Sequence, residues 1–242
     1  MKNLSKGLKT KLFALLGGMS ICALALQPAA AITFTATGSG SDGQLAASAD
    51  FTINPGSISF TLSNLLSASQ IRSSGQAVSD LSFTLSNDPG TVGTTSATGQ
   101  LANLTCSAQG GCSVSSPVSG SLTRWLDDIS IAGNTITLEA LGGGQPSQMI
   151  LPSASSFPNG NQGLDNFNPY VIGAGTFTLA LSGVTDLTTI TSATFSFGTG
   201  PDTFITVPVP GPIAGAGLPG LILAGGALVA LARRRKAGTA FG

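Results

Sequence analysis

The chain has 242 residues, of which only 8% are charged, and it contains no histidine. The absence of histidine excludes Ser-His-Asp and Cys-His nucleophile systems and the usual zinc sites. Formal neutrality hides a strong asymmetry: all ten acidic residues lie in the interior of the sequence, whereas most of the cations lie near its two ends.

Residues 1–31 have the pattern of a secretory signal peptide. Lysines come first, and a short apolar stretch follows at 12–26. The small residues Ala29 and Ala31 suit signal peptidase, so we expect cleavage after Ala31 and a new N-terminus at Ile32. A permanent N-terminal anchor is the alternative, which the shortness of the apolar stretch disfavours.

Residues 207–236 form a three-part pattern, followed by a short tail at 237–242. Twenty apolar residues at 213–232 would span about 30 Å as a helix, which is about the thickness of the bilayer hydrocarbon. The basic cluster after them is of the kind that stays on the cytoplasmic side. The preceding proline-rich motif is Val207, Pro208, Val209, Pro210, Gly211 and Pro212, and the basic cluster is Arg233, Arg234, Arg235 and Lys236.

This pattern resembles the PEP-CTERM sorting signal of bacterial exosortase substrates. Val209 stands where that family usually has glutamate, so the chain resembles a variant of the motif. The resemblance implies an inner-membrane anchor with a cytoplasmic C-terminus, processing by an exosortase-like enzyme, and a final place at the cell surface or in the extracellular matrix. A type I membrane anchor that is never cleaved is the alternative.

The remaining residues, 32–206, are sufficient for one domain with a sizeable core. Their ten acidic residues face only two cations, Arg72 and Arg124, so this body is strongly acidic. A nucleic-acid partner is therefore excluded on electrostatic grounds.

Cys106 and Cys112 are the two cysteines left after export. In an oxidising compartment, this spacing predicts a disulfide that closes a short loop and contributes about 2 kcal/mol. A redox-active pair is the alternative, although the C-x-x-C spacing is absent.

Alternation of apolar with serine or threonine residues predicts half-buried β-strands in the body. Residues 129–138 predict a tight hairpin that turns at Gly133-Asn134. The other expected strands are 57–62, 81–85, 177–181 and 195–197, with further ones near 32–37, 45–53, 101–106, 149–151 and 203–207.

The many short strands predict an all-β domain, specifically an antiparallel sandwich of the jelly-roll kind. Residues 153–168 have the weakest pattern and are expected to form a long loop. For the body as a whole, a disordered linker is the alternative to a folded domain. The alternating apolar residues disfavour it, because they supply a face that can form a core.

No catalytic motif is recognisable, and we expect no enzyme activity, cofactor or metal. The weaker options use carboxylates. A hydrolase could draw an acid and base pair from Asp127, Asp128, Glu139, Asp165, Asp186 and Asp202, although Asp127 and Asp128 would point to opposite faces if they lay on a strand. Calcium could bind at the loop with Asp42 or at Asn87-Asp88. Trp125 could stack on a sugar, but packing is favoured.

The resemblance to exosortase substrates implies an exported surface or matrix protein with a structural or adhesive role, and exopolysaccharide as a further expected partner. A carbohydrate- or calcium-binding module is the second hypothesis, and a carboxylate-dependent surface hydrolase is the third.

Overall fold

The computed structural model describes residues 31–142, 144–200 and 203–209. The predicted apolar span at 213–232 and almost all of the predicted signal peptide lie outside these residues. Within the described ranges, no helix is long and apolar enough to cross a membrane.

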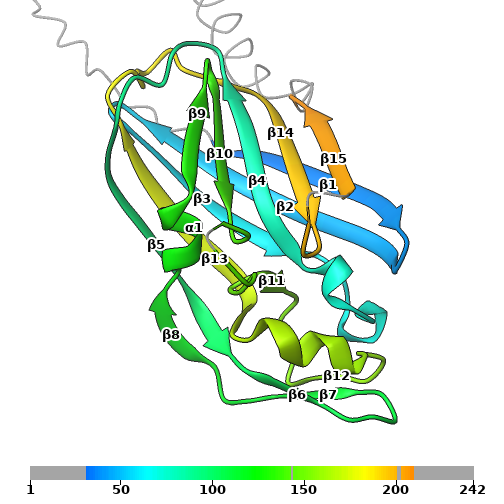
Figure 1. Ribbon diagram of the computed structural model, residues 1–242. Helices are drawn as coiled ribbons and strands as arrows, with labels where there is room; N and C mark the ends of the chain where they lie inside the picture. Colours follow the sequence, from blue (N-terminus) through cyan, green and yellow to red (C-terminus); the bar gives the residue numbers. More distant parts are fainter. Residues whose placement is uncertain (1–30, 143, 201–202, 210–242) are drawn as a thin grey trace, which may run out of the picture.

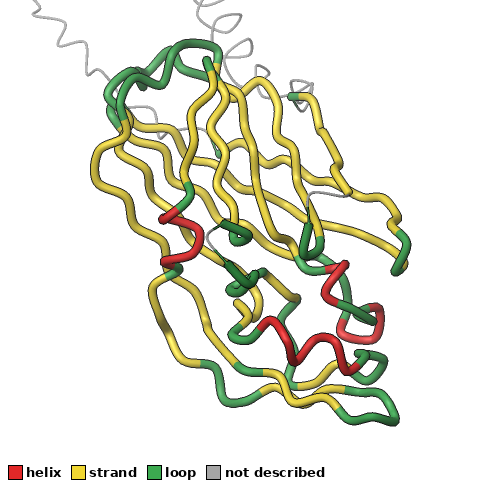
Figure 2. Tube along the Cα trace, viewed as in Figure 1, coloured by secondary structure: helices red, strands yellow, loops and turns green. Residues whose placement is uncertain are grey.

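Strands dominate the described chain, and its helical segments are short (Figure 2). The all-β prediction is therefore confirmed. The strands are β1 (Ile32–Gly40), β2 (Gly43–Asn54), β3 (Ser57–Asn64), β4 (Val78–Leu85), β5 (Val92–Ala102), β6 (Leu104–Cys106), β7 (Cys112–Val114), β8 (Val118–Ser121), β9 (Ile129–Ala132), β10 (Thr135–Glu139), β11 (Ile150–Leu151), β12 (Ser156–Phe157), β13 (Tyr170–Leu181), β14 (Ile190–Phe197) and β15 (Thr203–Pro208). The helical segments are η1 (Ala68–Gln70), η2 (Ser74–Gln76), α1 (Thr123–Asp127) and η3 (Gln162–Phe167).

Most strands lie in two layers (Figure 1). One layer has the order β1-β2-β3-β13-β5-β8, and the other has the order β9-β10-β4-β14-β15. The short strand β11 hydrogen-bonds to both, because Ile150 pairs with Val171 of β13 and with Val78 of β4. The β11–β13 pairing is parallel, which departs from the purely antiparallel arrangement expected from the sequence.

Aromatic side chains fill the space between the layers. The ring of Phe83, on β4, lies 5.0 Å from that of Phe51 and 5.7 Å from that of Phe60, both on the opposite layer. Phe60 also stacks on Phe177 at 4.7 Å. Each of these side chains is at most 2% exposed. The apolar positions of the alternating pattern therefore face inward, as their period of two requires.

The helix α1 was not expected from the sequence. It carries Trp125, which is fully buried against Phe177 and donates its indole N–H to the Gln148 carbonyl at 2.8 Å. Packing, the favoured interpretation of Trp125, is confirmed, and the residue lies on a helix. Residues 153–168 are not one long loop either, because β12 and η3 lie within them.

Candidate functional site

The outward side of the six-stranded layer carries a continuous row of polar side chains. The registers place one such residue on each strand at the same level. From β1 to β8 the row is Thr33, Asp50, Thr61, Thr176, Thr98 and Ser121. With strands about 4.8 Å apart, it is about 24 Å long.

A second, parallel row lies one pleat away, at about 7 Å. It crosses four strands and consists of Thr52, Ser59, Thr178 and Ser96. We call the two rows together the hydroxyl face. Its only charged member is Asp50, so it is a nearly neutral surface of serine and threonine hydroxyls.

The two outer sides of the molecule differ in how their hydroxyls are paired. On the five-stranded layer, hydroxyls bond to one another: Ser82 to Thr137 at 2.6 Å, Thr84 to Thr135 at 2.9 Å, and Thr194 to Thr206 at 2.9 Å. On the hydroxyl face, the corresponding bonds are Thr33 to Asp50 and Ser59 to Thr178.

Three central threonines of the hydroxyl face remain available to a ligand. Within the described part of the chain, the hydroxyls of Thr61, Thr98 and Thr176 have no side-chain partner, and Thr98 and Thr176 are exposed. Free donors and acceptors at regular spacing on a rigid sheet can bind a polyhydroxylated polymer.

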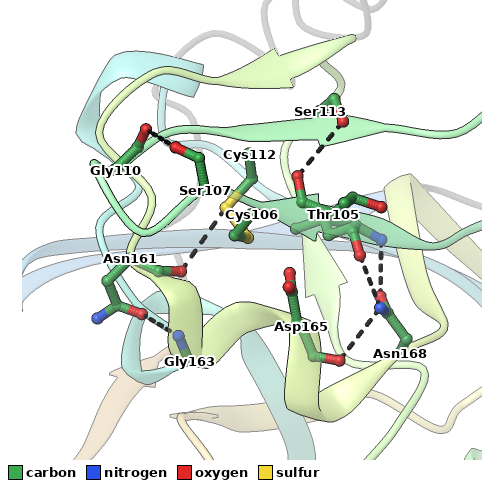
Figure 3. The surroundings of a disulfide bond; sticks show 11 residues. Thr105, Cys106, Ser107, Gly110, Cys112, Ser113, Asn161, Gly163, Asp165 and Asn168 are labelled. Atoms are coloured by element: carbon green, nitrogen blue, oxygen red, sulfur yellow. Dashed lines mark hydrogen bonds between the residues drawn. A yellow bond between two sulfur atoms is a disulfide. The ribbon is translucent and has the colours of Figure 1, made fainter.

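Cys106 and Cys112 lie at disulfide distance, as predicted, and join β6 to β7 (Figure 3). The intervening turn reverses through Gly110 and Gly111, both at positive φ, where glycine is unstrained. Asn168 holds the β6 backbone through two bonds, accepting from Leu104 N at 2.7 Å and donating to Leu104 O at 2.8 Å.

The disulfide borders a shallow hollow of about 580 Å³. The lining consists mostly of small polar side chains and backbone: Thr105, Ser107, Gly111, Ser113, Ser156 and Pro158, with both cysteines. Among the described residues that line it, none has an ionisable side chain or an aromatic ring, the groups used for acid–base chemistry and for sugar stacking.

Three carboxylates gather along the five-stranded layer. Asp80 on β4 pairs directly with Glu139 on β10, and Asp128 lies close enough to Glu139 for its charge to act on it. Burial raises the pKa of Asp80 to about 6; the Ser196 hydroxyl opposes the rise, and the Glu139 charge adds to it. Burial, and then the Asp128 charge, raise the pKa of Glu139. Nothing in the sequence marks Asp80, because its burial depends on which strands flank β4.

The carboxylates considered for catalysis or calcium do not converge. Asp127 ends α1 and Asp128 follows it, so neither residue lies on a strand. Asp88 accepts a bond from Gly90 N at 2.8 Å, which is the turn-stabilising role of such residues. Within residues 31–142, 144–200 and 203–209, no three acidic or cysteine side chains are grouped so that they could hold a metal ion.

The predicted processing residues fall mostly outside the described ranges. Ala29 and the residues from Pro210 onward, including the basic cluster Arg233 to Lys236, lie there, and Ala31 lies at the described N-terminal edge. The beginning of the proline-rich motif is described: Val207 pairs with Ala193 and Pro208 with Ser192, so β15 runs two residues past the expected domain end at 206. Val209 donates its backbone N–H to Thr191 O at 3.2 Å.

Comparison of the chain with protein-family models, with curated proteins and with solved structures finds no match.

Proposed function

We propose that this protein is exported, anchored and then processed through its C-terminal signal, and that it serves as a structural and adhesive component of the surface or extracellular matrix. The support for the route is the sequence: the signal-peptide pattern and the resemblance to a PEP-CTERM tail. Signal peptidase and an exosortase-like enzyme are the partners that this route requires.

The observation that carries the adhesive role is the hydroxyl face. Its continuous rows of hydroxyls match the chemistry of a neutral exopolysaccharide, whose surface is also made of hydroxyl donors and acceptors. Each net hydrogen bond is worth only about 1 kcal/mol, so useful affinity requires many of them at fixed spacing. A rigid sheet supplies that spacing without an ordering cost.

The role proposed is a non-catalytic one. Rows of hydroxyls across a sheet can contact a polymer along its length, whereas a hydrolase needs convergent acid and base groups around one bond. The acidic body also suits a matrix protein, because net charge keeps it soluble during export.

We further propose that the body is a β-sandwich related to the jelly roll. Face-to-face packing of Phe83 on Phe51 and Phe60 supports the sandwich. Repeated passage of the chain between layers, from β3 to β4, then to β5, and again from β13 to β14, supports the comparison with the jelly roll.

The test replaces three hydroxyls by methyl groups on the hydroxyl face. The variant Thr61→Val, Thr98→Val, Thr176→Val keeps side-chain shape and strand preference. We expect its cosedimentation with insoluble polysaccharide from the matrix of the producing cells to weaken at least about tenfold. Binding by the unmodified protein should persist at high salt, because the face is nearly uncharged.

The matched control is Thr84→Val, Thr137→Val, Thr194→Val on the opposite side, where the hydroxyls are already paired. It should bind as the unmodified protein does. Equal binding by all three proteins, at equal thermal stability, would show that the hydroxyl face does not bind the polysaccharide.

A further inference from the structure

We infer that one end of the body, which we call the loop end, rests on the surface of the bilayer while the C-terminal segment is inserted. The loop end comprises the turns at 54–56, 87–90 and 133–134, the loop at 183–189, and Val209. This inference deepens the proposed function and rests on its C-terminal anchor.

Backbone hydrogen bonds join these segments. Gly56 N donates to Val184 O at 2.9 Å, and Gly183 N donates to Pro89 O at 2.8 Å. Leu85 N donates to Asn134 O at 2.9 Å, which brings the β9–β10 turn to the same end. The segments lie together at the upper end of the molecule in Figure 1, where β15 also ends. The loop end is therefore a continuous surface.

The distance from this end to the predicted membrane span is short. Val209 is held by its bond to Thr191 O, and the apolar stretch begins at position 213. Four residue steps cover at most about 14 Å even when fully extended. The headgroup zone takes up about 6 Å of that distance. An inserted span would thus hold the loop end at or near the headgroups.

The loop end presents an apolar side chain outward. Leu187 is 88% exposed, more than any other large apolar side chain of the described chain. Its loop is fixed by hydrogen bonds, since Thr185 N donates to Thr188 Oγ1 at 2.9 Å and Leu187 N donates to Thr185 Oγ1 at 3.3 Å. Val209, 46% exposed, and Val92, 37% exposed, lie at the same end.

The occupant that fits this end is a lipid interface of neutral headgroups. Apolar residues on a loop tip, next to a tether that ends in a bilayer-length apolar stretch, would lie in the headgroup zone. Asp88 and Asp186 lie at the same end and would be repelled by anionic lipid. The contact is therefore expected to favour phosphatidylcholine over phosphatidylglycerol.

Tryptophan fluorescence in the full chain tests the inference. Leu187→Trp places a reporter at the loop end, and Val118→Trp, at a 67% exposed position in β8 at the other end, is the matched control. The native Trp125 is fully buried and supplies a constant background. Each protein is reconstituted into phosphatidylcholine vesicles with a bromine-labelled acyl chain, and vesicle flotation reports insertion.

We expect at least about twofold quenching of the reporter at position 187 and little at position 118. Inserting about twelve Gly-Ser residues between Val209 and Pro210 should abolish the difference while flotation continues, because a flexible linker frees the body. Equal quenching at 187 and 118 in proteins that float would overturn the inference and leave the anchor intact. Failure to float would overturn both the inference and the proposed anchor.

Discussion

Asp80 shows how the position of one residue in the sheet determines its chemistry. The residue is 7% exposed and lies opposite Glu139 in the register. Ser196, its register partner on β14, is itself buried, and its hydroxyl opposes the rise in pKa only in part. The carboxylate thus loses water without gaining a cation, and its pKa rises from the ordinary 3.8 to about 6.

This raised pKa makes stability depend on pH. Between about pH 4 and about pH 6, the folded protein retains the Asp80 proton that the unfolded chain releases. The unfolded state binds fewer protons there, so the free energy of unfolding falls as pH rises through this window and then levels off. The folded protein is therefore more stable at about pH 4 than at pH 7 as far as Asp80 is concerned.

Replacing Asp80 by asparagine should remove the loss of stability that accompanies ionisation of this buried carboxyl group. We expect Asp80→Asn to raise the free energy of unfolding at pH 7 by about 2 kcal/mol, and to change little near pH 4, because a neutral amide has no proton to lose. Urea denaturation across this pH range measures it. Asp186→Asn, in an exposed loop, is the control and should keep the pH slope of the unmodified protein; an undiminished slope in Asp80→Asn would contradict the assignment.

At the scale of elements, alternation predicted the strands with strongly apolar inner faces. Residues 57–62, 81–85 and 177–181 lie in β3, β4 and β13, and the hairpin at 129–138 turns at Gly133-Asn134. Most of β5 was missed because its inward positions include glycine and threonine, which give no apolar period. The short helix α1 was missed because one turn carries no periodic signal.

The rows of the hydroxyl face could not be predicted from the sequence either. Serine and threonine at alternate positions predict an outward face for each strand separately. Which residues of different strands become neighbours depends on register, and β5 joins β13 across a long sequence separation. The individual threonines were therefore predictable, whereas the continuous row was not.

Gly175 leaves the space in which α1 packs against the core. A Cβ at this position would lie 2.8 Å from Cε2 of Phe177 and 3.0 Å from Cδ1 of Leu122, the residue that begins the turn into α1. Both distances are shorter than ordinary van der Waals contact, so the neighbours must shift. The absence of a side chain on β13 is therefore required for the packing of Leu122 and Trp125.

We expect Gly175→Val to lower the free energy of unfolding by about 1–3 kcal/mol through overpacking. The emission of Trp125, the sole tryptophan, should also shift to the red as α1 is displaced. The control is Gly40→Val in β1, where the added Cβ meets Leu45 Cδ1 at 3.4 Å and nothing closer. A destabilised Gly175→Val protein with unshifted emission would show that α1 does not depend on this gap.

At the scale of the whole molecule, the described body joins the predicted C-terminal sorting signal at the loop end. β15 ends there at Pro208, and Val209 is still hydrogen-bonded. A processing enzyme needs an extended, unpaired substrate, so cleavage is expected beyond Val209. The sequence predicted the proline-rich motif as separate from the domain, but its first residues belong to the last strand, because Val207 continues the alternation of β15.

The central claim is that the chain is exported and cut at both ends, and intact-mass spectrometry of the protein released from the cell surface tests it most directly. We expect a first residue at Ile32 and a last residue between Pro210 and Ala232. Surface protein that still carries residues 1–31, or the peptide from Arg233 to Lys236, would contradict it.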